Sequence, residues 1–147
     1  MEVLSTTSEE FIEKVKKEMN YTLPTKINVM GMDFDITYTT EEEDPTIKGK
    51  SGVCYSLLKK IKIDQYIYLD DADGSVSEAE KSSKLLSLLA ILRHEVMHAF
   101  FFQSGLDTQC SFAVDEMLID WLSLKLPEIV EVMEENHLVE NRSLKRC

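Results

Sequence analysis

A pair of histidines inside one long apolar segment constrains this chain more than any other feature. The segment runs from Lys84 to Phe102 without proline or glycine and contains His94-Glu95-Val96-Met97-His98. In a helix, residues four apart lie one above the other on the same face, so both imidazoles can reach one metal ion, with Glu95 beside them. Such polar groups in a buried helix need partners, and a metal ion would supply one. The pattern therefore predicts a metal site in the middle of a core helix.

The alternative interpretation is a pair of core histidines bonded to backbone carbonyls, with Glu95 paired to Arg93 or to a lysine. Two histidines at this spacing, with a glutamate between them, favour zinc over that interpretation. A zinc ion activates water, and a glutamate next to it can accept the proton of that water. The motif thus indicates a metallopeptidase in which His94 and His98 bind zinc and Glu95 is the general base.

A catalytic zinc ion usually has three protein ligands and one open position, so a third ligand is needed. Glu116 is the best candidate because it lies among apolar neighbours in the next helical segment, where an unpaired carboxylate would be costly. Asp120 shares its helical face and could accept the second ring N–H of a ligand histidine. Two alternatives stay open: Asp107, Cys110 or Asp115 could be the third ligand, or both carboxylates could simply face solvent.

Other candidate groups have less support. His137, the third histidine, lies outside the apolar helix and is expected at the surface. An oxyanion donor is expected in a peptidase, and the groups considered are Tyr55, Tyr66, Tyr68 and His137. Each tyrosine is more typical of a residue that packs in a β-sheet, so none of these groups is assigned as the donor. Cys54 or Cys110 could block the open zinc position, although buried inert thiols are the simpler interpretation.

Length and composition indicate one domain over residues 1–147, with a tail frayed from about residue 138. The net charge of -11 argues against a nucleic-acid partner. No segment is predicted to cross a membrane, and the first residues lack the features of a secretion signal, so we expect a cytoplasmic protein. Three widely spaced cysteines indicate reduced thiols rather than disulfides.

The order of the predicted elements is that of an α+β fold. An amphipathic helix is expected over 8–19, followed by a hairpin of strands 26–30 and 33–40 and by strands 52–58 and 60–69. A turn at 70–74 precedes the long helix. A further helix is predicted from Ser111, broken or kinked at Pro127, and another over 128–136.

The motif and its surroundings resemble known zinc peptidases. Glu116 and Asp120 match the E-x-x-x-D helix of the gluzincins, peptidases whose third zinc ligand is a glutamate. The run 92–100, then Ser104-Gly105-Leu106 and Asp115-Glu116, resembles the small ImmA/IrrE-type metallopeptidases common in phages and mobile elements. The resemblance covers roughly residues 50–126 and is strong only at 92–120.

This resemblance implies a zincin-like fold: an amino-terminal helix, a small twisted sheet, the H-E-x-x-H helix and a helix carrying the third ligand. It further implies a zinc-dependent endopeptidase that acts on a protein substrate such as a repressor and is encoded by a phage in a bacterial host. In such folds the substrate lies along an edge strand, for which we expect residues 60–69.

Three rival interpretations are weaker. A metzincin would need glycine at Phe101 and histidine at Ser104. The acidic charge and the absence of a cysteine ribbon argue against SprT-like proteases. A non-catalytic zinc-stabilised phage structural or regulatory protein remains open, but a structural site has no need of Glu95.

Overall fold

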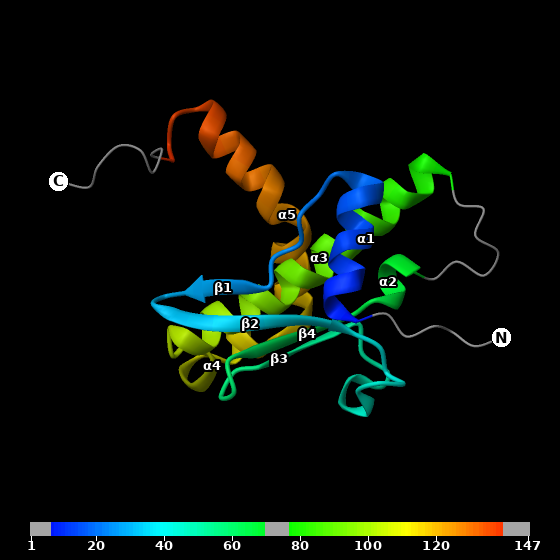
Figure 1. The fold of residues 1–147 in the computed structure, drawn as a ribbon. Coiled ribbons are helices and arrows are strands. Elements are labelled where there is room, and N and C mark those ends of the chain that lie inside the picture. Colours follow the sequence, from blue (N-terminus) through cyan, green and yellow to red (C-terminus); the bar gives the residue numbers. More distant parts are fainter. Residues whose placement is uncertain (1–6, 70–76, 140–147) are drawn as a thin grey trace.

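The computed structural model describes residues 7–69 and 77–139; the turn predicted at 70–74 and most of the predicted frayed tail lie outside these ranges. Its longer helices are α1 (Ser8–Met19), α3 (Glu78–Gln103) and α5 (Glu116–Glu135). Its strands are β1 (Lys26–Val29), β2 (Met32–Thr39), β3 (Gly52–Tyr55) and β4 (Lys60–Asp64). Short helical turns are η1 (Pro45–Ile47), α2 (Tyr66–Leu69), α4 (Leu106–Gln109) and η2 (Ser111–Val114). The predicted α+β class is confirmed (Figure 1).

Helix α1 has the predicted bounds because both of its ends are encoded locally. Thr7 and Glu10 form a capping box, in which each side chain accepts a hydrogen bond from the backbone N–H of the other, at 3.2 and 3.3 Å. Asn20 ends the helix in the left-handed conformation, with φ of 52°. The apolar face of the helix buries Phe11 and Val15 against the sheet.

The four strands form one mixed sheet in the order β1-β2-β4-β3. The predicted hairpin is confirmed as β1 and β2, which pair antiparallel around Met30 and Gly31, both with positive φ. Strand β4 pairs parallel with β2 and antiparallel with β3. The edges of the sheet are therefore β1 and β3.

The predicted strand 60–69 is wrong in two respects. It ends at Asp64, whose side chain accepts a hydrogen bond from the Tyr66 backbone N–H at 2.9 Å and starts the helical turn α2. This turn places the Tyr68 ring against Phe11 and lets its hydroxyl donate to Glu18 at 2.6 Å. Because β4 also lies inside the sheet, it cannot be the edge strand expected to receive a substrate. The edge on that side is β3.

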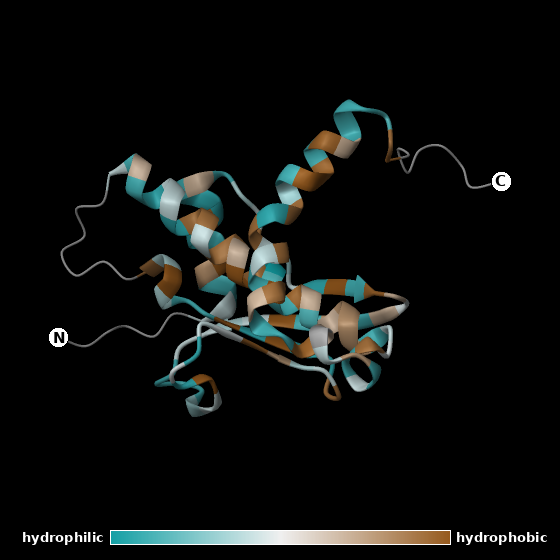
Figure 2. Cartoon of the chain, turned by 180° about the vertical axis from the view of Figure 1, so that it is seen from behind, coloured by the Kyte–Doolittle hydropathy of each residue, from teal (hydrophilic) through white to brown (hydrophobic). Residues whose placement is uncertain are grey.

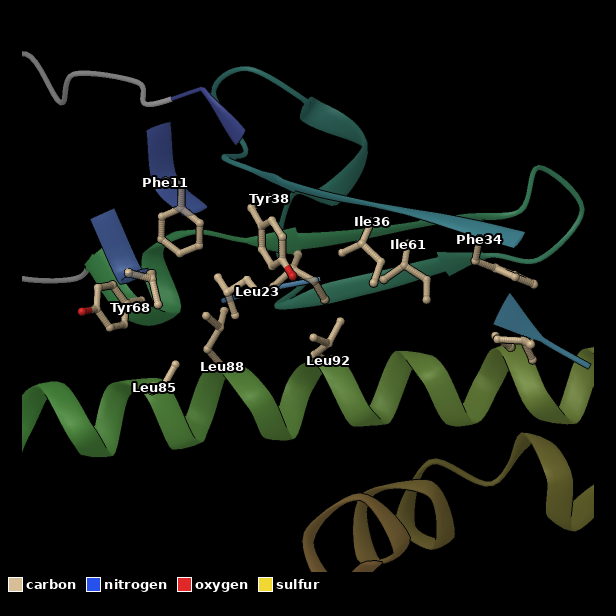
Figure 3. Close-up of a cluster of buried hydrophobic side chains, with 14 residues drawn as sticks. Phe11, Leu23, Phe34, Ile36, Tyr38, Ile61, Tyr68, Leu85, Leu88 and Leu92 are labelled. Atoms are coloured by element: carbon tan, nitrogen blue, oxygen red, sulfur yellow. The ribbon is translucent and has the colours of Figure 1, made fainter. Parts of the chain in front are cut away.

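The hydrophobic core lies between the sheet, α1 and one face of α3 (Figure 3). Strands β2 and β4 contribute apolar side chains from alternate positions, as expected for a sheet with one covered face. The fully or almost fully buried side chains of this core include Phe11, Phe34, Ile36, Tyr38, Ile61, Ile63, Leu88 and Leu92.

Helix α3 starts earlier than its apolar pattern predicts because Ser77 caps it, accepting a hydrogen bond from the Glu80 backbone N–H at 3.2 Å. By length and composition alone it would suffice to cross a membrane, a test that the core helix of a soluble protein also passes. Here it packs against the sheet and against α5, and it carries His94 and His98 in its second half.

Helix α5 differs from the prediction in where it begins and in how far it continues. Its first residue is Glu116 rather than Ser111, because residues 111–114 form η2 and Asp115 caps the helix. It also continues through Pro127 to Glu135, so of the two predicted effects of this proline, a break or a kink, the break does not occur. Proline has no N–H to donate to the carbonyl oxygen of Ser123 four residues earlier. That oxygen accepts a hydrogen bond from Arg93 Nε of α3 at 2.6 Å instead.

Candidate metal centre

Helix α3 brings His94 and His98 together on the side that faces α5. Their Nε2 atoms are 3.1 Å apart, and Glu116 reaches both from the first turn of α5. Glu116 Oε2 lies 2.9 Å from His94 Nε2, and its Oε1 lies 3.2 Å from His98 Nε2. Nitrogen and oxygen ligands of one metal ion at roughly 2.0–2.1 Å and at tetrahedral angles are about 3.3 Å apart, so these atoms are close enough together to share an ion. The three residues could hold a metal ion, as the sequence predicts.

The position of Glu116 follows from the cap in front of it. Asp115 Oδ1 accepts hydrogen bonds from the backbone N–H groups of Met117 and Leu118, at 2.9 and 3.2 Å, and so fixes the start of α5. This role accounts for Asp115, which the sequence left open as an alternative ligand. Cys110 and Asp107 likewise lie outside the group of three.

Asp120 lies one helical turn after Glu116 and touches the other side of the His94 ring. Its Oδ1 is 2.7 Å from His94 Nδ1, while His94 Nε2 faces Glu116. A carboxylate at this position favours the tautomer that carries its proton on Nδ1 and leaves Nε2 free to bind a metal. The side chain of Asp120 is 65% exposed at the edge of the site.

Glu95 is the buried acid of the site. It is 5% exposed, and its Oε1 lies 3.9 Å from His94 Nε2. Burial, together with a smaller effect of the nearby Glu116, raises the pKa of Glu95 to about 7 against the opposing effect of His94. A carboxyl group with a pKa near neutrality can both accept and return a proton at physiological pH. In the metal-free site, Glu95 is therefore close to half-protonated at neutral pH.

Burial acts on His98 in the direction that favours metal binding. Its side chain is 25% exposed, and the removal of water lowers its pKa, although Glu116 opposes this effect. The neutral imidazole is the form that binds metal ions. Burial of His98 therefore favours the form of the imidazole that can bind a metal ion.

The side chain of Glu95 is approached from the sheet by a residue that the sequence gives no reason to select. A Cβ atom on Gly52 of the edge strand β3 would lie 3.1 Å from Cγ of Glu95 and 3.0 Å from Cγ2 of Ile91. Only glycine lets β3 pass this close to α3 without displacing them. A small residue that opens an edge strand before an H-E-x-x-H helix is the only signal that could have indicated Gly52.

A pocket of about 380 Å³ opens beside the three possible ligands. It is bounded on one side by β3 and on the other by α4 and η2, and its lining includes His94, Glu95, His98, Glu116, Gly52, Cys54, Lys50 and Asp107. Lys50 brings a positive charge that lowers the pKa of Glu95, which partly offsets burial. Cys54 lines the pocket, but burial raises its pKa and keeps the thiol protonated. Sequence reasoning did not assign Lys50 to the site.

The structure places none of the four predicted oxyanion candidates in the lining of this pocket. Tyr68 is buried against Phe11 of α1 and its hydroxyl donates to Glu18, and Tyr66 lies in α2 near Glu42. His137 follows the end of α5 and is exposed, as expected for a surface residue. Tyr55 stacks under Lys62 and does not line the pocket.

Comparison with known proteins adds no assignment. No protein-family model matches the chain, and neither a curated protein nor a solved structure is similar enough to count as a match. The site is therefore defined by its own geometry, as a group of two histidines and one glutamate that could hold a metal ion beside a buried acid and an open pocket.

Proposed function

We propose that the protein is a zinc-dependent endopeptidase. The observation that carries the proposal is the convergence of His94, His98 and Glu116 next to the buried carboxyl of Glu95. A zinc site that only stabilises a fold usually has four protein ligands and no adjacent base. The site here has three possible ligands, an acid with a pKa of about 7 and a pocket. These features fit a hydrolytic site better than a structural zinc site.

Each side chain has a definite task in this proposal. Zinc held by His94, His98 and Glu116 would polarise the scissile carbonyl and lower the pKa of water. Glu95 would take a proton from the attacking water and deliver it to the leaving amine. Asp120 would orient the His94 ring through its contact with Nδ1. Water and substrate would reach Glu95 through the pocket.

The substrate would be an extended segment of a protein. Strand β3 is an edge of the sheet and lines the pocket with Gly52, Val53 and Cys54, so its free backbone groups could pair with a peptide beside the possible metal ligands. The resemblance to gluzincins and to ImmA/IrrE-type peptidases supports this interpretation and suggests a repressor-like substrate in the cytoplasm of a bacterial host. No nucleic acid or membrane enters the proposed reaction.

Cleavage of a peptide library by the zinc-loaded protein tests the proposal. Wild type, Glu95→Gln and the control Glu128→Gln, which removes an exposed charge from α5, would be compared by mass spectrometry of the products. We expect Glu95→Gln to retain zinc and to lose cleavage by about 10²–10⁴-fold, the usual contribution of a general base. Glu128→Gln should behave as wild type.

Two results would contradict the peptidase. One is the absence of cleavage by zinc-loaded wild type, and the other is equal cleavage by Glu95→Gln. If, in addition, a chelator unfolded the protein, the alternative of a non-catalytic zinc-stabilised structural or regulatory protein would replace it.

A further inference from the structure

Helix α5 has an exposed face that nothing in the described structure covers. Its residues recur at alternating intervals of four and three, the spacing of a coiled-coil seam. We call this face the α5 seam; it consists of Met117, Trp121, Leu124, Glu128, Glu131 and Glu135. All six are exposed, and the three apolar members are exposed by 83%, 54% and 60%. The opposite face buries Ile119 and Ser123 against the domain.

The two halves of the α5 seam differ in chemistry. Met117, Trp121 and Leu124 make its first half apolar, and three glutamates make its second half acidic. Of these glutamates, Glu128 has a surface ion pair with Lys125 at 3.3 Å, a contact of small expected energy. A partner that covers the seam must therefore bury apolar side chains at one end and bring positive charge to the other.

The apolar half lies beside the candidate metal centre. Met117 follows Glu116 in the sequence, and Trp121 follows Asp120, so the seam and the site occupy adjacent faces of one helix. Val114, which precedes the helix, is 55% exposed and lines the pocket. The acidic half projects away from the rest of the domain in both views (Figures 1 and 2). A helix bound along the seam would thus have one end at the pocket.

We propose that the α5 seam binds a helix of a partner protein whose contacting face is apolar over one half and rich in lysine or arginine over the other. Exposed apolar side chains in a regular row are the usual anchors for such a helix. The glutamates select the partner through charge complementarity, which also accelerates association. Binding in this mode needs no metal ion, so it is independent of the proposed peptidase activity.

A second copy of this chain fits the seam poorly. In a parallel pair the glutamates of the two copies would face each other, and like charges at such positions destabilise. In a full antiparallel pair, Trp121 of one copy would face Glu131 of the other. An antiparallel pair limited to the apolar halves would bury only three side chains from each copy, too few for a stable dimer.

The test uses the fluorescence of Trp121, which is the only tryptophan in the sequence. The probe is a designed helical peptide with leucine at the contacting positions of one half and lysine at those of the other, made in both orders. The control peptides carry glutamate in place of lysine. We expect one lysine peptide to shift the emission of metal-free protein saturably to shorter wavelength, and the glutamate peptides to have no effect. Rising salt should weaken the binding.

Matched variants locate the binding on the helix. Two double variants should each lower the affinity for the lysine peptide at least tenfold. One is Met117→Ser with Leu124→Ser, and the other is Glu128→Gln with Glu131→Gln. Val130→Ser and Glu134→Gln change exposed residues on other faces of α5 and should leave the affinity unchanged. Circular dichroism would confirm that all variants are folded.

Three results would overturn the inference. They are no saturable response to either lysine peptide, equal binding of the glutamate peptides, and equal affinity in the seam and control variants. Sedimentation of the protein alone adds a fourth: concentration-dependent dimerisation that shifts Trp121 emission would assign the seam to a second copy. The peptidase proposal would survive each of these results, because its own test depends on Glu95 and zinc.

Discussion

Two faces of helix α3 pack against neighbouring elements, and different interactions hold each of them. Toward the sheet it places Leu85, Leu88 and Leu92 in the apolar core, each at most 8% exposed. Toward α5 it makes directional polar contacts, through Arg93 to a carbonyl oxygen and through His94 to carboxylates. Apolar burial is insensitive to pH and to metal ions, whereas the polar contacts depend on both. Stability and the proposed chemistry should therefore be separable by face.

Leu88→Ala should have the largest effect on stability. Leu88 is fully buried, and its truncation is expected to lower the free energy of unfolding by about 2–5 kcal/mol. The loss should be the same with and without zinc, as measured by urea denaturation. Leu86 lies on the same helix but is 65% exposed, so Leu86→Ala should change stability by less than about 0.5 kcal/mol. If the loss of stability in Leu88→Ala depended on zinc, the two faces of α3 would not contribute independently.

The polar face should make the metal-free protein sensitive to pH. Because the folded state raises the pKa of Glu95 from 4.5 to about 7, it binds more protons than the unfolded state between these values. The stabilisation that protonated Glu95 contributes is fully present below pH 4.5 and is lost as the pH rises to about 7. The loss amounts to roughly 3 kcal/mol at most. Glu95→Gln keeps the shape of the side chain but cannot ionise.

Thermal or urea denaturation at a series of pH values would measure this effect. The stability of Glu95→Gln relative to wild type should increase from about pH 5 to about pH 7 and level off at higher pH. A difference that does not vary over this range would show that the folded state does not shift the Glu95 titration.

Asp120 tests whether the contact with His94 tunes a metal site. Asp120→Ala should weaken zinc binding by about 10–100-fold, because His94 Nδ1 loses its carboxylate partner, while Asp120→Asn should recover part of the loss. The core should be unaffected, since the side chain is 65% exposed. Competition with a chromophoric chelator gives the affinities. Equal zinc affinity in wild type and Asp120→Ala would remove Asp120 from the site.

The smallest expected effect on stability, and the most specific prediction, concerns the contact between Arg93 and the helix turn before Pro127. Arg93→Met should cost about 1–2 kcal/mol, because it leaves the carbonyl oxygen of Ser123 without a donor. Pro127→Ala restores a backbone N–H four residues after Ser123. In that background Arg93→Met should cost clearly less, as a double-mutant cycle would show. Additive effects of the two substitutions would contradict this explanation of how α5 passes through proline.

The parts of the site that the sequence predicts are those encoded within one helix. His94, Glu95 and His98 are related by helical spacing alone, and Glu116 with Asp120 repeats that spacing in the next helix. The bounds of α1 follow from a local capping box and a left-handed cap. In each case the physical cause lies within a few residues of its effect.

The errors and omissions arise where the cause is distant in the sequence. The order of strands depends on which edges pair, so the edge role assigned to residues 60–69 belongs to β3. The expected break at Pro127 fails because the partner of the Ser123 carbonyl is Arg93, thirty residues earlier. Gly52 matters only because β3 crosses close to Glu95. None of these relations has a periodic pattern that a sequence could display.

The most direct test of the proposed site is the zinc content per chain, measured by elemental mass spectrometry after metal repletion and removal of free metal. Wild type and Leu86→Ala should each retain about one zinc ion per chain, whereas His98→Ala and Glu116→Ala should retain almost none. Zinc-free wild type would contradict the metal centre. Full retention in Glu116→Ala would show that the third ligand lies elsewhere and that the face of α3 toward α5 is not organised as proposed.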